Sequence, residues 1–198
     1  MNSTNSIGDS LYPTLILAGG ASKRMGRNKA TMIVDGSPMI VNVAHALRDG
    51  GCKSIIVAVR DGFQRQEIMG ALSHLSDVQC ILDNDLERSA KSGLRSALRE
   101  CAERGIERIQ LAPCDMPWID SQVFERLREG SRPVIMPRGE HLQPLLSLVD
   151  VNVALGALER AEMRASLKNT LRSVPCQIMD FPKGVQFRNA NAPEDLNS

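Results

Sequence analysis

The chain has 198 residues, of which 24 are Lys or Arg and 23 are Asp or Glu, so its formal net charge is +1. This balance leaves no global field to attract nucleic acid or a membrane surface, and we expect neither as a partner. The length suits one domain with a substantial core. Because the first dozen residues are mostly polar, we expect residues 1–13 to be a disordered tail and residues 14–198 to form that domain.

The cysteine content and the apolar runs bear on the cellular compartment. The five cysteines are widely spaced and contain no Cys-x-x-Cys pair, which favours a reducing environment. No apolar run approaches the roughly 18 residues of a membrane span. The amino-terminal residues lack the basic start and apolar middle of a signal peptide. We therefore expect a cytoplasmic protein.

Apolar periodicity divides the chain into alternating strands and helices. Strands are predicted at residues 14–18, 54–59, 78–82, 108–112, 133–136, 143–149 and 176–181. Helices are predicted at residues 38–49, 64–75, 90–104, 121–128, 151–161 and 164–171, the first with Ser37 as N-cap and Pro38 in its first turn. The short connection before residue 143 requires antiparallel pairing. The pattern predicts one three-layer α/β domain with a mostly parallel, mixed sheet.

A glycine pair ends the first predicted strand and is followed by basic residues. Gly19 and Gly20 permit backbone angles that expose N–H groups, and Arg24 and Lys29 add positive charge for an anionic ligand. A Walker A loop is excluded because five residues separate Gly20 from Gly26, and the dinucleotide fingerprint is absent. A glycine-rich turn beside a basic surface loop is the alternative, but the clustered cations favour a phosphate-binding loop.

Carboxylates follow the third and fourth predicted strands. Asp83 could accept hydrogen bonds from ribose hydroxyls at this sheet edge, or could lie in a solvated loop. Asp115 lies between Pro113 and Pro117, which fix the backbone, so it suits a Mg²⁺ ligand as well as a turn or cap residue. Together with the basic glycine loop, an acidic strand end indicates a Mg-nucleotide site.

Three segments carry a family resemblance. Residues 17–26, LAGGASKRMG, followed by Lys29, resemble the signature of the nucleotidyltransferase superfamily that includes the molybdenum cofactor guanylyltransferases. Residues 114–117, CDMP, resemble the family's Cys-Asp-x-Pro motif, and residues 187–196 resemble its closing motif. The resemblance implies a three-layer α/β/α fold of the Rossmann-like, nucleotide-diphospho-sugar transferase type, with a mostly parallel sheet and an antiparallel strand.

The resemblance also implies roles for individual residues. Arg24, Lys29 and Asp115 are the implied catalytic residues, and Asp115 is the implied ligand of Mg²⁺. The implied nucleotide-binding residues are Leu17, Ala18, Gly19, Gly20, Lys29, Asp83 and Asp115. Gly93, Asn189 and Asn191 are implied on the acceptor side, although an Asx turn before a terminal helix is an alternative for the two asparagines.

The implied reaction is nucleotidyl transfer. By resemblance, GMP passes from GTP to the terminal phosphate of molybdenum-molybdopterin, pyrophosphate is released, and molybdenum cofactor proteins are possible transient partners. Val59 precedes Arg60 where family members often carry asparagine, so a cytidylyltransferase acting on the same pterin, or a sugar-phosphate nucleotidyltransferase, stays open. A nucleotide-binding carrier of the molybdenum cofactor is the non-catalytic alternative; Lys29 and Asp115 speak against it.

Overall fold

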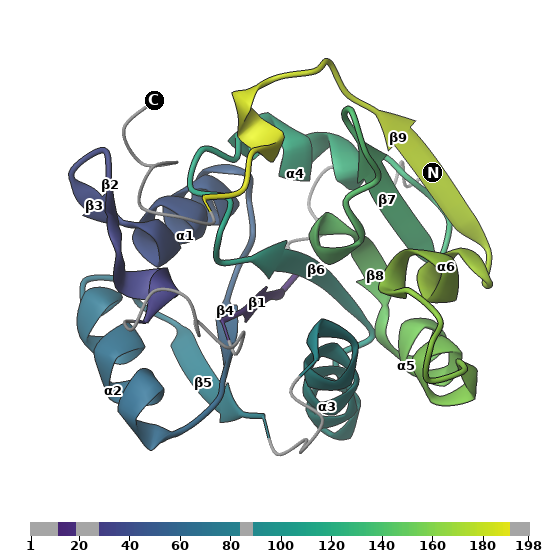
Figure 1. Cartoon of the computed structure of the whole chain (residues 1–198), viewed down its shortest axis with the longest axis horizontal. Coiled ribbons are helices and arrows are strands. Elements are labelled where there is room, and N and C mark those ends of the chain that lie inside the picture. The colour runs from purple at the N-terminus through teal and green to yellow at the C-terminus, as the bar shows by residue number, and fades with distance from the viewer. Residues whose placement is uncertain (1–11, 19–27, 84–88, 191–198) are drawn as a thin grey trace, which may run out of the picture.

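A computed structural model describes residues 12–18, 28–83 and 89–190. Its strands are β1 (Thr14–Leu17), β2 (Ile33–Val34), β3 (Ser37–Pro38), β4 (Ile55–Val59), β5 (Val78–Leu82), β6 (Arg108–Pro113), β7 (Val134–Arg138), β8 (Leu148–Asp150) and β9 (Cys176–Asp180). Within the described residues, one seven-stranded sheet has the order β5-β4-β1-β6-β8-β7-β9, and β2 pairs with β3 in a separate hairpin. The large sheet runs from β5 at the lower left of Figure 1 to β9 at the upper right.

The directions of the strands match the predicted mixed sheet. β1 pairs in parallel with β4 on one side and with β6 on the other, and β5 extends the parallel run beyond β4. β8 runs antiparallel to both β6 and β7, whereas β7 and β9 are parallel. The short connection between β7 and β8 explains why that pair is antiparallel.

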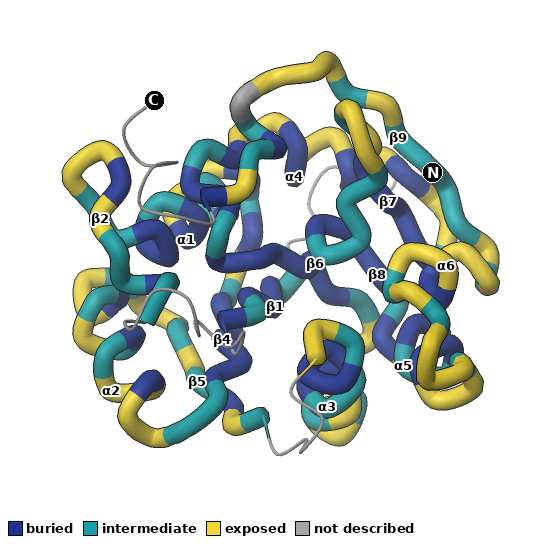
Figure 2. The backbone as a smooth tube through the Cα atoms, in the orientation of Figure 1, coloured by how far each residue is buried: buried dark blue, intermediate teal, exposed yellow. Residues whose placement is uncertain are grey.

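Helices cover both faces of the sheet. The helices are α1 (Met39–Asp49), α2 (Gly62–Ala71), α3 (Ala90–Glu103), α4 (Ser121–Leu127), α5 (Val151–Arg160) and α6 (Leu167–Arg172), with short 3-10 turns η1 (Lys29–Thr31), η2 (Pro144–Leu146) and η3 (Val185–Phe187). Ile16 and Val57 face the core with α1, α2 and α4, whereas Leu15 and Ile56 face the core with α3, α5 and α6. The inner strands β1, β4, β6, β7 and β8 are therefore mostly buried between two helical layers, as the α/β/α prediction requires, whereas the edge strands β5 and β9 are partly exposed (Figure 2).

The first helix begins later than predicted. Asp35 and Gly36 both have positive φ, 52° and 83°, which is the backbone of a tight two-residue hairpin. Ser37 and Pro38 consequently pair with Ile33 and Val34 as β3. The prediction that Ser37 caps the helix is wrong, because α1 starts at Met39 without a side-chain cap.

Other element boundaries also differ from the prediction. Asp61 caps α2, so this helix begins two residues earlier than predicted. The backbone N–H of Gln64, and then Arg60, hold the pKa of the Asp61 carboxyl below its usual value. Pro144 begins a 3-10 turn, so the predicted strand at 143–149 is reduced to β8. α6 starts at Leu167 after its cap, three residues later than predicted.

The sheet order creates a switch point at β1. The chain leaves β1 for β4 and β5 on one side and then crosses to β6 on the other. The carboxyl ends of these parallel strands lie along one sheet edge, where ligands of open α/β sheets bind. No helix in the described part of the chain has the length and hydropathy needed to cross a bilayer.

Candidate nucleotide and metal site

Lys29 and Asp115 meet at the switch point although they lie 86 positions apart in the chain. Lys29 Nζ donates to Asp115 Oδ2 at 2.9 Å, and the two side chains are 17% and 27% exposed. Partial burial weakens the screening of the two charges by water, so the electrostatic interaction of the pair is stronger than on an open surface. The remaining exposure leaves the pair accessible to a ligand. The structure thus brings together Lys29, which follows the basic loop, and Asp115 at the acidic strand end, while their roles stay predictions.

Backbone bonds hold the turn that carries Asp115. Cys114 N donates to the Leu17 carbonyl at 3.3 Å, which continues the β1–β6 pairing beyond the last paired residues. From the far end of the chain, Ala190 N donates to the Asp115 carbonyl at 2.9 Å. Cys114 itself is buried, and burial together with the neighbouring Asp115 raises the pKa of its thiol to about 12. This thiol is therefore a core residue rather than a nucleophile.

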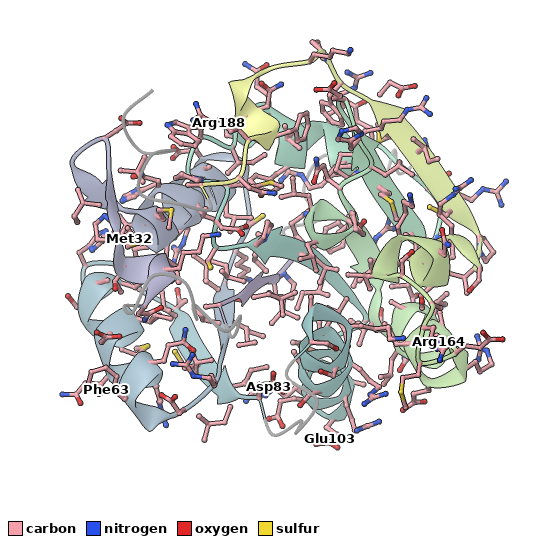
Figure 3. The ribbon with its side chains drawn as sticks, viewed as in Figure 1. Met32, Phe63, Asp83, Glu103, Arg164 and Arg188 are labelled. Carbon is pink, nitrogen blue, oxygen red and sulfur yellow. The ribbon has the colours of Figure 1, made fainter. Side chains whose placement is uncertain are left out.

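Asp83 lies at the next predicted acidic strand end. Its backbone N–H donates to the Val59 carbonyl at 2.7 Å, which fixes it at the end of β5, and Figure 3 shows it on the side facing α3. Gly93 lies opposite in the first turns of α3, where an added Cβ would stand 2.9 Å from Asp83 Oδ2. The Asp83 carboxylate therefore lies where a side chain at position 93 would begin, a relation that the sequence did not suggest.

The carboxyl-terminal segment lies beside the Asp115 turn. Asn189 is exposed and precedes Ala190, whose N–H binds the Asp115 carbonyl. The Arg188 guanidinium lies 5.1 Å from the centre of the Trp118 ring, and Trp118 Nε1 donates to Asp35 Oδ2 at 2.9 Å. Hairpin, turn and carboxyl-terminal segment thus form one wall of the site, on the side where Figure 3 labels Met32 and Arg188.

The remaining predicted site residues divide into two groups. Leu17 ends β1 and Ala18 follows it as a buried residue, so both border the switch point. The predictions for Gly19, Gly20, Arg24 and Asn191 fall outside the described residues.

Sequence reasoning missed a polar contact between the two flanks of residues 19–27. Gln64 Nε2 donates to the Ala18 carbonyl at 2.7 Å and to Asn28 Oδ1 at 3.2 Å. The sequence feature that could have indicated this contact is the spacing of Gln64, which lies four residues before Ile68 and eight before Leu72, both of them buried. A polar residue in such an apolar stripe must find partners inside the protein.

The donor set fits a hard divalent cation. Among the described residues, no three or more His, Cys, Asp or Glu side chains gather into a metal-binding group. Asp115 offers carboxylate oxygen at a partly open position. A cation that takes one or two carboxylates and completes its coordination with phosphate oxygens suits this arrangement, whereas a cation that needs several side-chain ligands does not.

Comparison with known proteins identifies relatives across most of the chain. Residues 14–177 match the MobA-like NTP transferase domain. The chain is 29% identical to the molybdenum cofactor guanylyltransferase of Ectopseudomonas mendocina, over 92% of this chain and 88% of that protein.

Solved structures share the fold. Molybdopterin-guanine dinucleotide biosynthesis protein A from Archaeoglobus fulgidus has a TM-score of 0.68 at 22% identity, over 93% of this chain and 94% of that one. Rv0371c from Mycobacterium tuberculosis, solved as a complex with manganese, has a TM-score of 0.71 at 16% identity, over 95% and 98%. The matched domain spans well over half of the chain. The chain therefore belongs to the MobA-like NTP transferase family and is a nucleotidyltransferase.

Proposed function

We propose that the protein transfers GMP from GTP to the terminal phosphate of molybdenum-molybdopterin and releases pyrophosphate. The observation that carries this proposal is the Lys29–Asp115 ion pair at the β1–β6 switch point. The choice of substrates is supported by the name of the Ectopseudomonas mendocina relative.

The proposed reaction requires charge stabilisation more than proton transfer. An oxygen of the acceptor phosphate attacks the α-phosphorus of GTP, the bond from that phosphorus to the bridging oxygen breaks, and pyrophosphate takes the electron pair. Because the acceptor phosphate is already ionised, no strong general base is needed. The Lys29 ammonium would stabilise negative charge on the phosphate oxygens in the transition state.

Asp115 is the proposed ligand of a divalent cation, and we propose Mg²⁺. The metal would neutralise charge on the phosphate oxygens of the nucleotide. Lys29 occupies one carboxylate oxygen of Asp115, so the side chain balances the lysine charge while its other oxygen can hold the cation.

The other proposed contacts follow the sheet edge. Leu17, Ala18 and Asp83 would contact the nucleotide, and Gly93 and Asn189 would border the acceptor. Gly19, Gly20, Arg24 and Asn191 keep the roles that the sequence resemblance implies, with Arg24 beside the phosphates. The side of the site formed by Asn189 and the turn at Asp115 joins the carboxyl-terminal segment to a turn from the middle of the chain.

A nucleotide panel tests the proposed donor. Purified protein is mixed with Mg²⁺, molybdenum-loaded molybdopterin and each of GTP, CTP, ATP and UTP in turn, and pyrophosphate release is followed. We expect turnover with GTP. Turnover with CTP alone would instead support a cytidylyltransferase, which the Val59-Arg60 sequence leaves open. Absence of turnover with every nucleotide, despite binding of the pterin, would favour a carrier.

Replacing Gly93 with alanine tests the proposed role of Asp83. The new Cβ would lie 2.9 Å from Asp83 Oδ2, so the carboxylate must move away. We expect the KM for GTP to rise about tenfold, or about 1.4 kcal/mol of binding free energy, with a smaller change in kcat.

Gly70→Ala is the matched control for this prediction. Gly70 is also helical, but nothing lies within 4 Å of its added Cβ, so the control should keep the KM and gain a few tenths of a kcal/mol or more in stability. An unchanged KM in Gly93→Ala would remove Asp83 from the nucleotide site.

A further inference from the structure

Gln64 is a buried polar residue on the inner face of α2. The residue is 1% exposed, and it lies in line with Ile68 and Leu72, which are 0% and 1% exposed. A hydrophobic residue would fill this position at lower desolvation cost. The amide is therefore kept in the core by the hydrogen bonds that it makes.

The Gln64 amide joins three separate segments at the sheet edge. Nε2 donates to the Ala18 carbonyl at 2.7 Å and to Asn28 Oδ1 at 3.2 Å, while Oε1 accepts from Arg60 N at 2.8 Å. Both hydrogens of the amide nitrogen are thus used. One side chain connects the end of β1, the start of η1 and the turn after β4.

Glu67 fixes the orientation of Asn28 in this network. Asn28 Nδ2 donates to Glu67 Oε2 at 3.0 Å. Because an ionised carboxylate only accepts hydrogen bonds, this contact turns Asn28 Oδ1 toward Gln64 Nε2. The same oxygen accepts from Ala30 N at 3.3 Å and so caps η1.

Lys29 is the first residue of the capped turn. Asn28 is its N-cap, and Thr31 Oγ1 also donates to the Asn28 carbonyl at 3.1 Å. The backbone from which the Lys29 side chain extends is therefore held through Asn28, and Lys29 Nζ reaches Asp115 at 2.9 Å. A lysine stem has several rotatable bonds, so a fixed origin limits where its ammonium can lie.

We infer that Gln64 is a positioning residue which, through Asn28, holds the Lys29 ammonium in place beside Asp115 for nucleotidyl transfer. The inference rests on the proposed role of Lys29. The hydrogen bonds of Gln64 and Asn28 hold the backbone beside Lys29 and not the Lys29 side chain itself. Loss of these bonds should therefore misplace the Lys29 ammonium rather than remove it. Misplacement of a catalytic group by about 1 Å can cost about a hundredfold in rate.

The first test replaces Gln64 with methionine, which is similar in length but makes none of the three hydrogen bonds. We expect kcat for pyrophosphate release, with GTP, Mg²⁺ and molybdenum-loaded molybdopterin, to fall about tenfold to a hundredfold. The KM for GTP should change less than about threefold, because the group that contacts phosphate is still present.

Gln110→Met is the matched control. Gln110 is also buried, at 2% exposed, and its Nε2 donates to the Leu111 and Leu146 carbonyls at 2.8 Å each. Its replacement should lower the thermal midpoint as Gln64→Met does, but leave kcat within about twofold, because its side-chain hydrogen bonds within the described part of the chain do not lead to η1. Equal losses of kcat in the two variants would overturn the inference.

The second test exchanges donor and acceptor between Asn28 and Glu67. Asn28→Asp alone sets two carboxylates against each other and should lower kcat about tenfold or more. Adding Glu67→Gln supplies an amide donor at position 67, restores a complementary pair and keeps the net charge of the pair. Recovery of most of the lost kcat supports the inference, and no recovery contradicts it.

A double-mutant cycle with Lys29→Ala separates this inference from the proposed role of Lys29. If Gln64 acts through Lys29, Gln64→Met should lower kcat less than about twofold in the Lys29→Ala background. The same loss in both backgrounds would show that Gln64 does not act through Lys29. If Lys29→Ala alone turns over normally, the proposed role of Lys29 fails, whatever Gln64 does.

Discussion

Replacing Asp115 with alanine is expected to lower pyrophosphate release about a thousandfold while the chain stays folded. The change removes the proposed metal ligand and leaves the Lys29 ammonium without its carboxylate partner. The Asp115 side chain is 27% exposed, so water can solvate the lysine and the fold should survive. The measurement is kcat with GTP and saturating Mg²⁺, beside a thermal unfolding curve of the same preparation.

Two further variants make the Asp115 prediction specific. Asp115→Asn keeps the size of the side chain but loses its charge, and it should be almost as inactive as the alanine variant. Asp120→Ala removes the carboxylate that caps α4 through Gln122 N, which should cost about 1 kcal/mol of stability and leave activity within about twofold. Near-normal turnover in Asp115→Ala would refute the metal assignment.

Replacing Lys29 with alanine is expected to lower kcat about a hundredfold and to raise the KM for GTP. The Lys29 side chain is only 17% exposed and lies at the β1–β6 switch point, so water would replace its ammonium poorly as a partner for phosphate oxygens. Asp115 would also lose its counter-charge. Steady-state kinetics over a GTP series measure both parameters.

Lys29→Arg and Lys53→Ala complete this comparison. Arginine keeps the positive charge but has a planar, larger head group, so its activity should lie between the native and alanine values. Lys53 is exposed beside the start of β4, and its removal deletes the same charge without effect on turnover. A Lys29→Ala enzyme as active as Lys53→Ala would mean that another cation serves the phosphates.

The sheet and part of the site could be predicted because their signals are local. Runs of β-branched residues and helical apolar periodicity are enough to predict the strands of the large sheet and the helices, and Asp115 is recognisable as a carboxylate shortly after a buried strand. The boundaries were harder. Ser37 and Pro38 are good helix-start residues, but the Asp35-Gly36 turn pairs them in a hairpin, and the tertiary arrangement overrides propensity.

The contacts that were missed join distant parts of the chain. The apolar periodicity predicts Gln64 as the first residue of a helix, and nothing near it in the sequence indicates that its amide reaches Ala18 and Asn28, 46 and 36 positions away. The position of the Asp83 carboxylate beside Gly93 likewise depends on how α3 packs beside the end of β5. The position of a residue at a strand end predicts that it borders the ligand site. Which of these residues contact one another depends on how the helices pack against the sheet.

The bond from Ala190 to the Asp115 carbonyl has a consequence for synthesis on the ribosome. Residues 188–190 follow every strand of the described sheet, yet they complete the wall beside Asp115. Chains emerge from the amino terminus onward, so a nascent polypeptide that has just exposed β9 already contains all the sheet strands. The turn at Asp115 still lacks the backbone donor that Ala190 supplies. The nucleotidyltransferase site is therefore finished after its scaffold.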